Sequence, residues 1–203
     1  MLYADGALAW GSGEYAAQHR LYESAAVSRE LNDPASLAVT WWVLGTVALF
    51  QGDPHAAHAH WQQSVATARQ SGSTWQLGMS LNGQARALVE LGDHASARRL
   101  LDESLVLLRQ TGDRWALSAP FYGLGLLSFL EGKYTAAHNW IEEARANRHE
   151  ARDRWSAAQA LSRLGVIAHG LGDIRRAREY STESLILFRD LGIAKASLAP
   201  LRE

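Results

Sequence analysis

The sequence repeats itself at an interval of forty residues, and this period limits the possible folds more than any other feature. Gly-Asp or Gly-Lys pairs recur at that interval: Gly52-Asp53, Gly92-Asp93, Gly132-Lys133 and Gly172-Asp173. Four more columns of residues keep the same spacing: Ala17, Ala57, Ala97, Ala137 and Ala177; Gly45, Ala85, Gly125 and Gly165; Ser24, Ser64, Ser104, Ala144 and Ser184; Trp75, Trp115 and Trp155. A fixed period of roughly 20 to 50 residues indicates an array of stacked structural repeats.

Each repeat is predicted to contain two helices. Residues 41–50 and 121–130 are apolar over much of a helix circumference, which is typical of a helix buried between neighbours. The glycine of each pair is expected to end this first helix in the left-handed conformation. The aspartates that follow are expected to cap the second helix: Asp53, Asp93 and Asp173. The second helices are expected to end near a cation: Arg69, Arg109 and Arg189.

Small residues occupy the positions where the two helices of a repeat must approach closely. Gly125 on the first helix and Ala137 on the second are twelve residues apart, as are Gly45 and Ala57. A bulky side chain there would separate the helices, so we interpret the glycine, alanine and serine columns as packing positions. Pro120 falls several residues inside a first helix, where it removes one backbone hydrogen bond. We therefore expect a kink or a late helix start in that repeat.

One repeat carries a recognisable order of residue types: a large apolar residue, Leu-Gly, a small residue, an aromatic residue and a second small residue. The residues are Trp41, Leu44-Gly45, Ala57, Trp61 and Ser64. This order resembles the signature of the tetratricopeptide repeat (TPR) family, whose usual repeat is shorter, at about 34 residues. It recurs over 121–144 and 161–184, whereas Gln84-Ala85 departs from it. The resemblance implies an all-α fold, a right-handed superhelical solenoid of about five helix-turn-helix repeats and the start of a sixth.

We expect these repeats to form one domain over residues 1–203. The expected units are 1–32, 33–72, 73–112, 113–152 and 153–192, with a partial helix over 193–203. Ala199-Pro200-Leu201 repeats Ala119-Pro120-Phe121, so the last unit is incomplete and we expect a segment of a longer protein. Forty-residue repeats with Gly-Asp-Arg-Trp joints resemble the C-terminal arrays of large bacterial LuxR-type and MalT-like regulators. Repeats of similar length also occur in eukaryotic adaptors that bind G-protein subunits.

In TPR arrays the first helix of each unit lines a continuous concave groove. Transferring that position predicts these ligand-binding residues: Val39, Trp42, Thr46, Phe50, Met79, Asn82, Arg86, Glu90, Tyr122, Leu126, Phe129, Gln159, Ser162 and His169. Their neighbours on the same face are Leu49, Val89, Ala119, Leu130, Val166 and Gly170. The face is apolar, which suits an amphipathic helix or an extended apolar peptide better than a clamp for a terminal carboxylate. The alternative is that Leu49, Phe50 and Leu130 are buried against neighbouring units.

Composition and motifs exclude several other functions. The formal net charge is −1, so no basic surface for nucleic acid or an anionic membrane is expected, and there is no cysteine for a disulfide or a zinc site. His55, His58 and His60 lack a carboxylate at matching spacing, so no metal site is predicted. No strand precedes Gly132-Lys133, which excludes a phosphate-binding loop, and no nucleophile, base and orienting group converge. We expect neither catalysis nor a cofactor.

These observations predict a non-catalytic scaffold that binds a protein or peptide partner in its groove. The alternative is an effector-sensing regulatory domain of a larger bacterial transcriptional activator or ATPase, with a small-molecule effector. No apolar run reaches the ~18 residues of a membrane span, and the N-terminus does not resemble a signal peptide. A cytoplasmic location is therefore expected.

Overall fold

A computed structural model describes residues 14–149 and 154–191, and within these ranges the chain is helical without strands. The all-α class predicted from the sequence is confirmed. The helices are α2 (Glu14–Glu30), α3 (Pro34–Phe50), α4 (Pro54–Ser71), α5 (Thr74–Glu90), α6 (His94–Thr111), α7 (Arg114–Leu130), α8 (Tyr134–His149), α9 (Arg154–Gly170) and α10 (Ile174–Asp190). The expectations for the first residues of the chain and for a partial helix over 193–203 lie outside the described residues.

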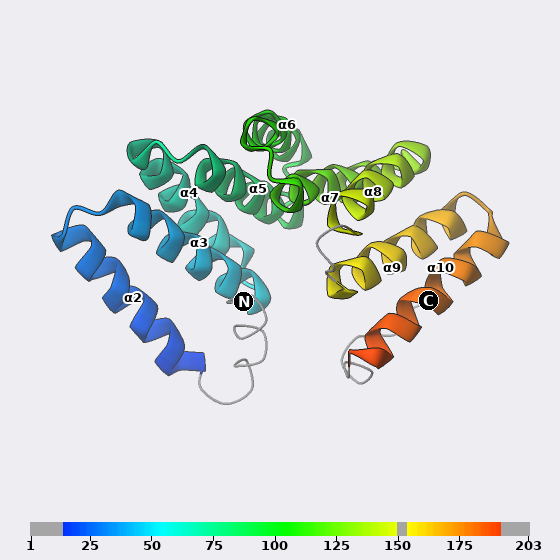
Figure 1. The fold of residues 1–203 in the computed structure, drawn as a ribbon, viewed down its shortest axis with the longest axis horizontal. Helices are drawn as coiled ribbons and strands as arrows, with labels where there is room; N and C mark the ends of the chain where they lie inside the picture. The colour runs from blue at the N-terminus through cyan, green and yellow to red at the C-terminus, as the bar shows by residue number, and fades with distance from the viewer. Residues whose placement is uncertain (1–13, 150–153, 192–203) are drawn as a thin grey trace. The chain divides into compact units, whose positions relative to one another are not determined.

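The chain divides into two compact groups, residues 1–111 and 112–203. In the first group α2 packs on α3, α3 on α4, α4 on α5 and α5 on α6. In the second group α7 packs on α8, α8 on α9 and α9 on α10. Within each group, helices that follow one another in the sequence therefore lie side by side (Figure 1). The predicted division into forty-residue units remains a proposal.

The turn that ends each first helix follows from the Gly-Asp and Gly-Lys pairs. Gly52 has a φ of +78°, which an L side chain rarely adopts. Its N–H donates a hydrogen bond to the carbonyl of Leu49 at 3.0 Å, and the N–H of Asp53 donates one to the carbonyl of Ala48 at 3.0 Å. These two bonds form a Schellman motif, which satisfies carbonyls at the end of the helix. Gly92, Gly132 and Gly172 repeat the conformation, so the predicted helix ends are confirmed.

The aspartate after Gly52, Gly92 and Gly172 then caps the second helix, whereas Lys133 follows Gly132. The Asp53 carboxylate accepts a hydrogen bond from the N–H of Ala56 at 2.9 Å. Asp93 and Asp173 accept equivalent bonds at 3.0 Å. Such caps satisfy backbone donors that have no partner within the helix. The three predicted N-caps are confirmed, and the structure adds Asp33 and Asp113 as caps of first helices.

Close helix contacts explain the glycine column. A Cβ placed on Gly45 would lie 2.8 Å from the indole of Trp61, and one on Gly125 would lie 2.6 Å from the Cδ1 of Ile141. Ala57 and Ala137 are fully buried beside them. The predicted close approach is confirmed, with one refinement: each glycine faces the side chain sixteen positions later in the sequence.

The serine column contributes hydrogen bonds in addition to packing. The Ser64 hydroxyl donates to the carbonyl of Ala38, Ser104 to Gly78 and Ser184 to Ala158, each at 2.7 Å. Each of these bonds joins the second helix of a unit to the backbone of the first, and all three hydroxyls are buried. The repeat that carries Ala144 lacks this bond. Packing alone was predicted from the sequence, so the bonds are a finding of the structure.

Pro120 lies inside α7 and does not delay its start. The helix begins at Arg114, in register with Pro34 of α3 and Thr74 of α5, so of the two expectations the late start is wrong and the kink stays a prediction. Pro120 is fully buried, and tertiary packing holds the helix through the residue that lacks an N–H donor. Across the described ranges, no helix is both long and apolar enough to cross a membrane.

Candidate binding surface on the first helices

The predicted ligand-binding residues all lie on the first helices, α3 and α5 in the first group and α7 and α9 in the second. They differ in accessibility. The exposed side chains are Val39, Phe50, Arg86, Glu90, Ser162 and His169. The half-buried side chains are Trp42, Thr46, Asn82, Tyr122, Leu126, Phe129 and Gln159. Met79 is only 4% exposed and belongs to the core, so it offers no accessible surface to a partner.

In the first group Trp42 ties two first helices together. Its indole N–H donates to the carbonyl of Met79 at 3.3 Å, which joins α3 to α5. The Thr46 hydroxyl turns back to the carbonyl of Trp42 at 3.0 Å. Trp42 therefore has two roles: its hydrogen bond holds α3 against α5, and the exposed part of its ring belongs to the candidate binding surface.

Phe50 provides the most accessible apolar area of this group's predicted site. The side chain is 56% exposed, and the guanidinium of Arg86 lies 5.8 Å from the centre of its ring. At that distance a cation is attracted to the negative face of an aromatic ring. Leu130 in the second group is 48% exposed. The alternative expectation, burial of Phe50 and Leu130 against neighbouring units, is therefore wrong, whereas Leu49 is half-buried and packs on the core.

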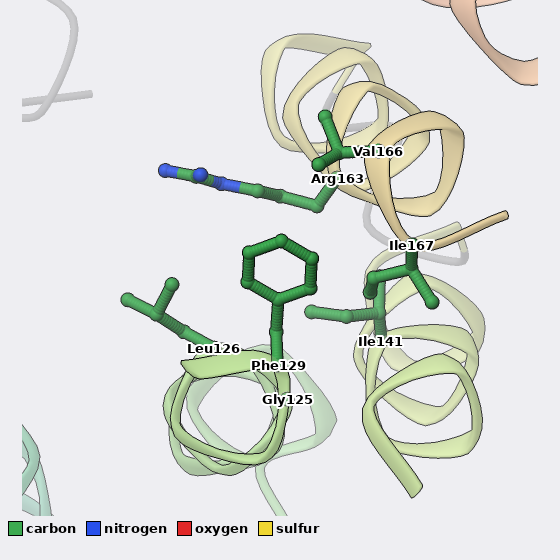
Figure 2. A pocket seen from close by; sticks show the side chains of 7 residues that line it. All are labelled: Gly125, Leu126, Phe129, Ile141, Arg163, Val166 and Ile167. Atoms are coloured by element: carbon green, nitrogen blue, oxygen red, sulfur yellow. The ribbon is translucent and has the colours of Figure 1, made fainter. Parts of the chain in front are cut away.

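In the second group, α7 and α9 border a small apolar cleft. Leu126 and Phe129 of α7 stand on one side and Val166 of α9 on the other, and Figure 2 shows the Phe129 ring between the two helices. Ile141 and Ile167 lie deeper, at 1% and 2% exposure. The cleft volume is about 10 Å³, room for about one water molecule. Three of these residues lie on the first-helix face that the TPR resemblance predicted: Leu126, Phe129 and Val166.

Arg163 also lines this cleft, and sequence reasoning missed it. Its Nε donates to the hydroxyl of Tyr122 at 3.1 Å, so one guanidinium edge is held against α7. Arg163 is one position after Ser162, outside the face transferred from the family. Its side chain is long enough to reach over from α9, which helical spacing does not reveal. The signal available in the sequence was a cation in an otherwise uncharged stretch, 155–168.

The histidines set aside as a metal site have other surroundings. The His60 ring stacks on Trp41 with centroids 5.6 Å apart, and its Nε2 shares a hydrogen bond with the Tyr22 hydroxyl at 3.3 Å. Burial lowers the pKa of His60, and the Asp53 carboxylate opposes that shift. Burial and then the neighbouring His55 lower the pKa of His58. Among the residues the structure describes, no cluster of three or more His, Asp or Glu side chains could hold a metal ion.

Comparison with known proteins supports the repeat type. A family model described as tetratricopeptide repeat matches residues 38–63 and 78–103. No curated protein matches the sequence. The chain is similar in structure to BtubC (BKLC) from P. vanneervenii, at 17% identity and a TM-score of 0.73, over 98% of this chain and 82% of that one.

Two further solved structures resemble the chain. Aspartyl phosphate phosphatase F from Bacillus subtilis is 16% identical, with a TM-score of 0.74 over 93% of this chain and 50% of that one. RapI, solved in its apo form, is 9% identical, with a TM-score of 0.68 over 87% of this chain and 72% of that one. At such low identities the likeness shows the fold alone and transfers no activity. The chain thus has the fold of TPR-like helical solenoids, and two of its stretches match the tetratricopeptide repeat family.

Proposed function

We propose that this chain is a non-catalytic interaction module that binds a peptide or a segment of a partner protein on its first helices. The proposal rests on the exposed large apolar side chains of those helices together with the groove that the TPR resemblance assigns to them, because second helices expose apolar side chains such as Val106 to a similar degree. Phe50 and Val39 are 56% and 49% exposed in the first group, and Leu130 and Val166 are 48% and 40% exposed in the second. Apolar area that stays exposed on a folded domain often marks an interaction site.

The TPR-like fold supports this reading because each unit adds a similar helix to an extended surface. The interior supports it as well. The hydroxyls of Ser64, Ser104 and Ser184 are buried and donate to backbone carbonyls, so they are not available as nucleophiles. A catalytic site needs a nucleophile, a base and an orienting group that converge at an accessible place. A binding role needs only the exposed apolar side chains that the first helices present.

The size of the cleft between α7 and α9 favours a peptide over a small-molecule effector. Pockets for small molecules usually enclose roughly 300 to 1,000 Å³ and surround most of the ligand. This cleft has room for about one water molecule. It suits the tip of one side chain of a longer partner. The resemblance to LuxR-type and MalT-like arrays and the cytoplasmic location remain predictions from the sequence.

A peptide-display selection against the full chain, followed by affinity measurements on matched variants, tests this proposal. Phe50→Ser and Leu130→Ser remove exposed apolar side chains from first helices. Val106→Ser and Ile186→Ser are controls, because Val106 and Ile186 are 55% and 44% exposed and occupy equivalent positions on second helices. We expect the first pair to weaken peptide binding by about tenfold, or about 1.4 kcal/mol, and the control pair to leave it unchanged. Equal effects from both pairs would overturn the proposal.

A further inference from the structure

The cleft between α7 and α9 joins an apolar hollow to a cation. Leu126, Phe129 and Val166 form its accessible sides, and the buried Ile141 closes its base (Figure 2). Gly125 lies beneath, where a Cβ would come within 2.6 Å of Ile141. The lining of the hollow is apolar, so the tip of an aliphatic or aromatic side chain fits it better than a charged or strongly polar group does.

Arg163 stands at the rim of this hollow. Its side chain is exposed, and Figure 2 shows it extending from α9 across the Phe129 ring toward the side of α7. The Nε donor is used by the Tyr122 hydroxyl at 3.1 Å. That bond restrains the guanidinium at the edge of the hollow. A restrained guanidinium presents its terminal donors in a fixed plane, which matches a carboxylate better than any other common side chain.

The charges on the neighbouring helices favour the same partner. The sequences of α7 and α9 contain no Asp or Glu, whereas the chain as a whole has a formal net charge of −1. On α8, which packs against both helices, the Glu142 carboxylate pairs with Arg145 at 2.8 Å. Among the residues that line the cleft, Arg163 carries the only charge, and it is positive. A cation at the rim of an apolar cleft attracts an acidic segment and repels a basic one.

From this combination we infer that the cleft is an anchor site for an acidic apolar peptide. A Leu or Phe side chain of the partner packs on the accessible surfaces of Leu126, Phe129 and Val166 with only its tip in the hollow, and an Asp or Glu beside it pairs with Arg163. The inference rests on the proposed binding function and makes it specific: Arg163 selects for the carboxylate, and Phe129 with Val166 selects for the apolar anchor. The first group also has a cation beside an exposed apolar side chain, Arg86 over the ring of Phe50. This pair is not part of the cleft between α7 and α9.

Three synthetic peptides with a fluorescent label test the inference on the full chain. All have about 15 residues, long enough to cover one helix face, with the same Leu and Phe positions. They differ only in their polar positions, which are Glu, Gln or Lys. Fluorescence anisotropy gives each affinity at low and at high salt. We expect the Glu peptide to bind about tenfold tighter than the Gln peptide and the Lys peptide to bind most weakly, with the differences shrinking as salt screens them.

Variants assign the preference to the cleft. Arg163→Gln is expected to abolish the advantage of the Glu peptide and to leave the Gln peptide unchanged. Val166→Ser is expected to weaken all three peptides by a similar factor. Arg175→Gln is the control, because Arg175 is an exposed arginine on a second helix, paired with Glu179 at 2.7 Å. Circular dichroism of each variant shows whether its helices are intact.

The outcomes separate this inference from the proposal on which it rests. Equal binding of the three peptides, no binding of any, or a Glu preference that survives Arg163→Gln overturns the inference. In each case the display selection and the Phe50→Ser and Leu130→Ser variants still test, independently, whether the chain binds peptides on its first helices. A Glu preference lost only in Arg163→Gln, with the Arg175→Gln control unchanged, supports the acidic apolar partner.

Discussion

The indole of Trp61 lies between two glycines, Gly45 and Gly83. Replacing a helical glycine by alanine usually stabilises a protein, but here it is expected to destabilise it. A Cβ on Gly83 would lie 2.5 Å from the indole Nε1, and a Cβ on Gly45 would lie 2.8 Å from the same ring. Trp61 is 2% exposed, so its rigid ring has little room to move away from either helix. Gly83→Ala is therefore expected to destabilise the chain.

The magnitude follows from two opposing effects. In an exposed helix, replacing Gly by Ala stabilises by about 1 kcal/mol because the unfolded chain loses less conformational freedom on folding. Inserting a methyl group into a well-packed site costs about 1 to 3 kcal/mol. A carbon 2.5 Å from ring atoms is about 1 Å closer than ordinary contact. The steric cost should therefore be near the upper end of its range, for a net loss of about 1 to 2 kcal/mol.

Urea unfolding followed by far-ultraviolet circular dichroism measures this loss, and a double-mutant cycle assigns its cause. In a Trp61→Leu background the ring is gone, so Gly83→Ala should become neutral or stabilising. The difference between the two backgrounds is the coupling between Gly83 and Trp61. A Gly83→Ala chain that is as stable as the parent, or a loss that persists without Trp61, would refute the packing described for these helices.

Two further predictions concern stability. The folded state lowers the pKa of His58 and His60 below 6.5, mainly through burial, so it binds fewer protons than the unfolded chain. The contribution of these histidines to stability should be full above pH 6.5 and should be lost as the pH drops through their pKa values in the folded chain. His60→Gln should reduce this loss. A urea midpoint that is independent of pH between about 7.5 and 5.5 would contradict the prediction. Ser104→Ala removes the bond to the Gly78 carbonyl and should cost about 1 kcal/mol in urea unfolding. A neutral result would mean that the serine column serves packing only.

Sequence reasoning predicted the turns well because their causes are local. Gly52 ends its helix since the backbone there needs a positive φ, and Asp53 caps the next helix since its carboxylate reaches an N–H three residues later. Both requirements appear within a few letters of sequence. The forty-residue period then identified the same turn at its other positions.

The features that sequence reasoning missed depend on contacts between helices. The Ser104 hydroxyl meets a carbonyl 26 residues earlier, a distance that residue spacing does not supply. Helical position placed Met79 and Phe50 on one face, but their depth differs, 4% against 56% exposed, because neighbouring helices cover one and leave the other. Arg163 joined the cleft through the reach of its side chain. Burial by packing also explains why Pro120 sits inside α7 without delaying its start.

Methyl NMR of the full chain shows directly whether partners bind to the first helices. Exposed methyl groups report on both kinds of helix: Val39, Leu130 and Val166 on first helices, and Val106 and Ile186 on second helices. The spectrum is recorded with and without a peptide obtained by display selection. Binding on the first helices predicts chemical-shift changes at Val39, Leu130 or Val166, and none at Val106 or Ile186. Changes confined to Val106 and Ile186 would contradict it.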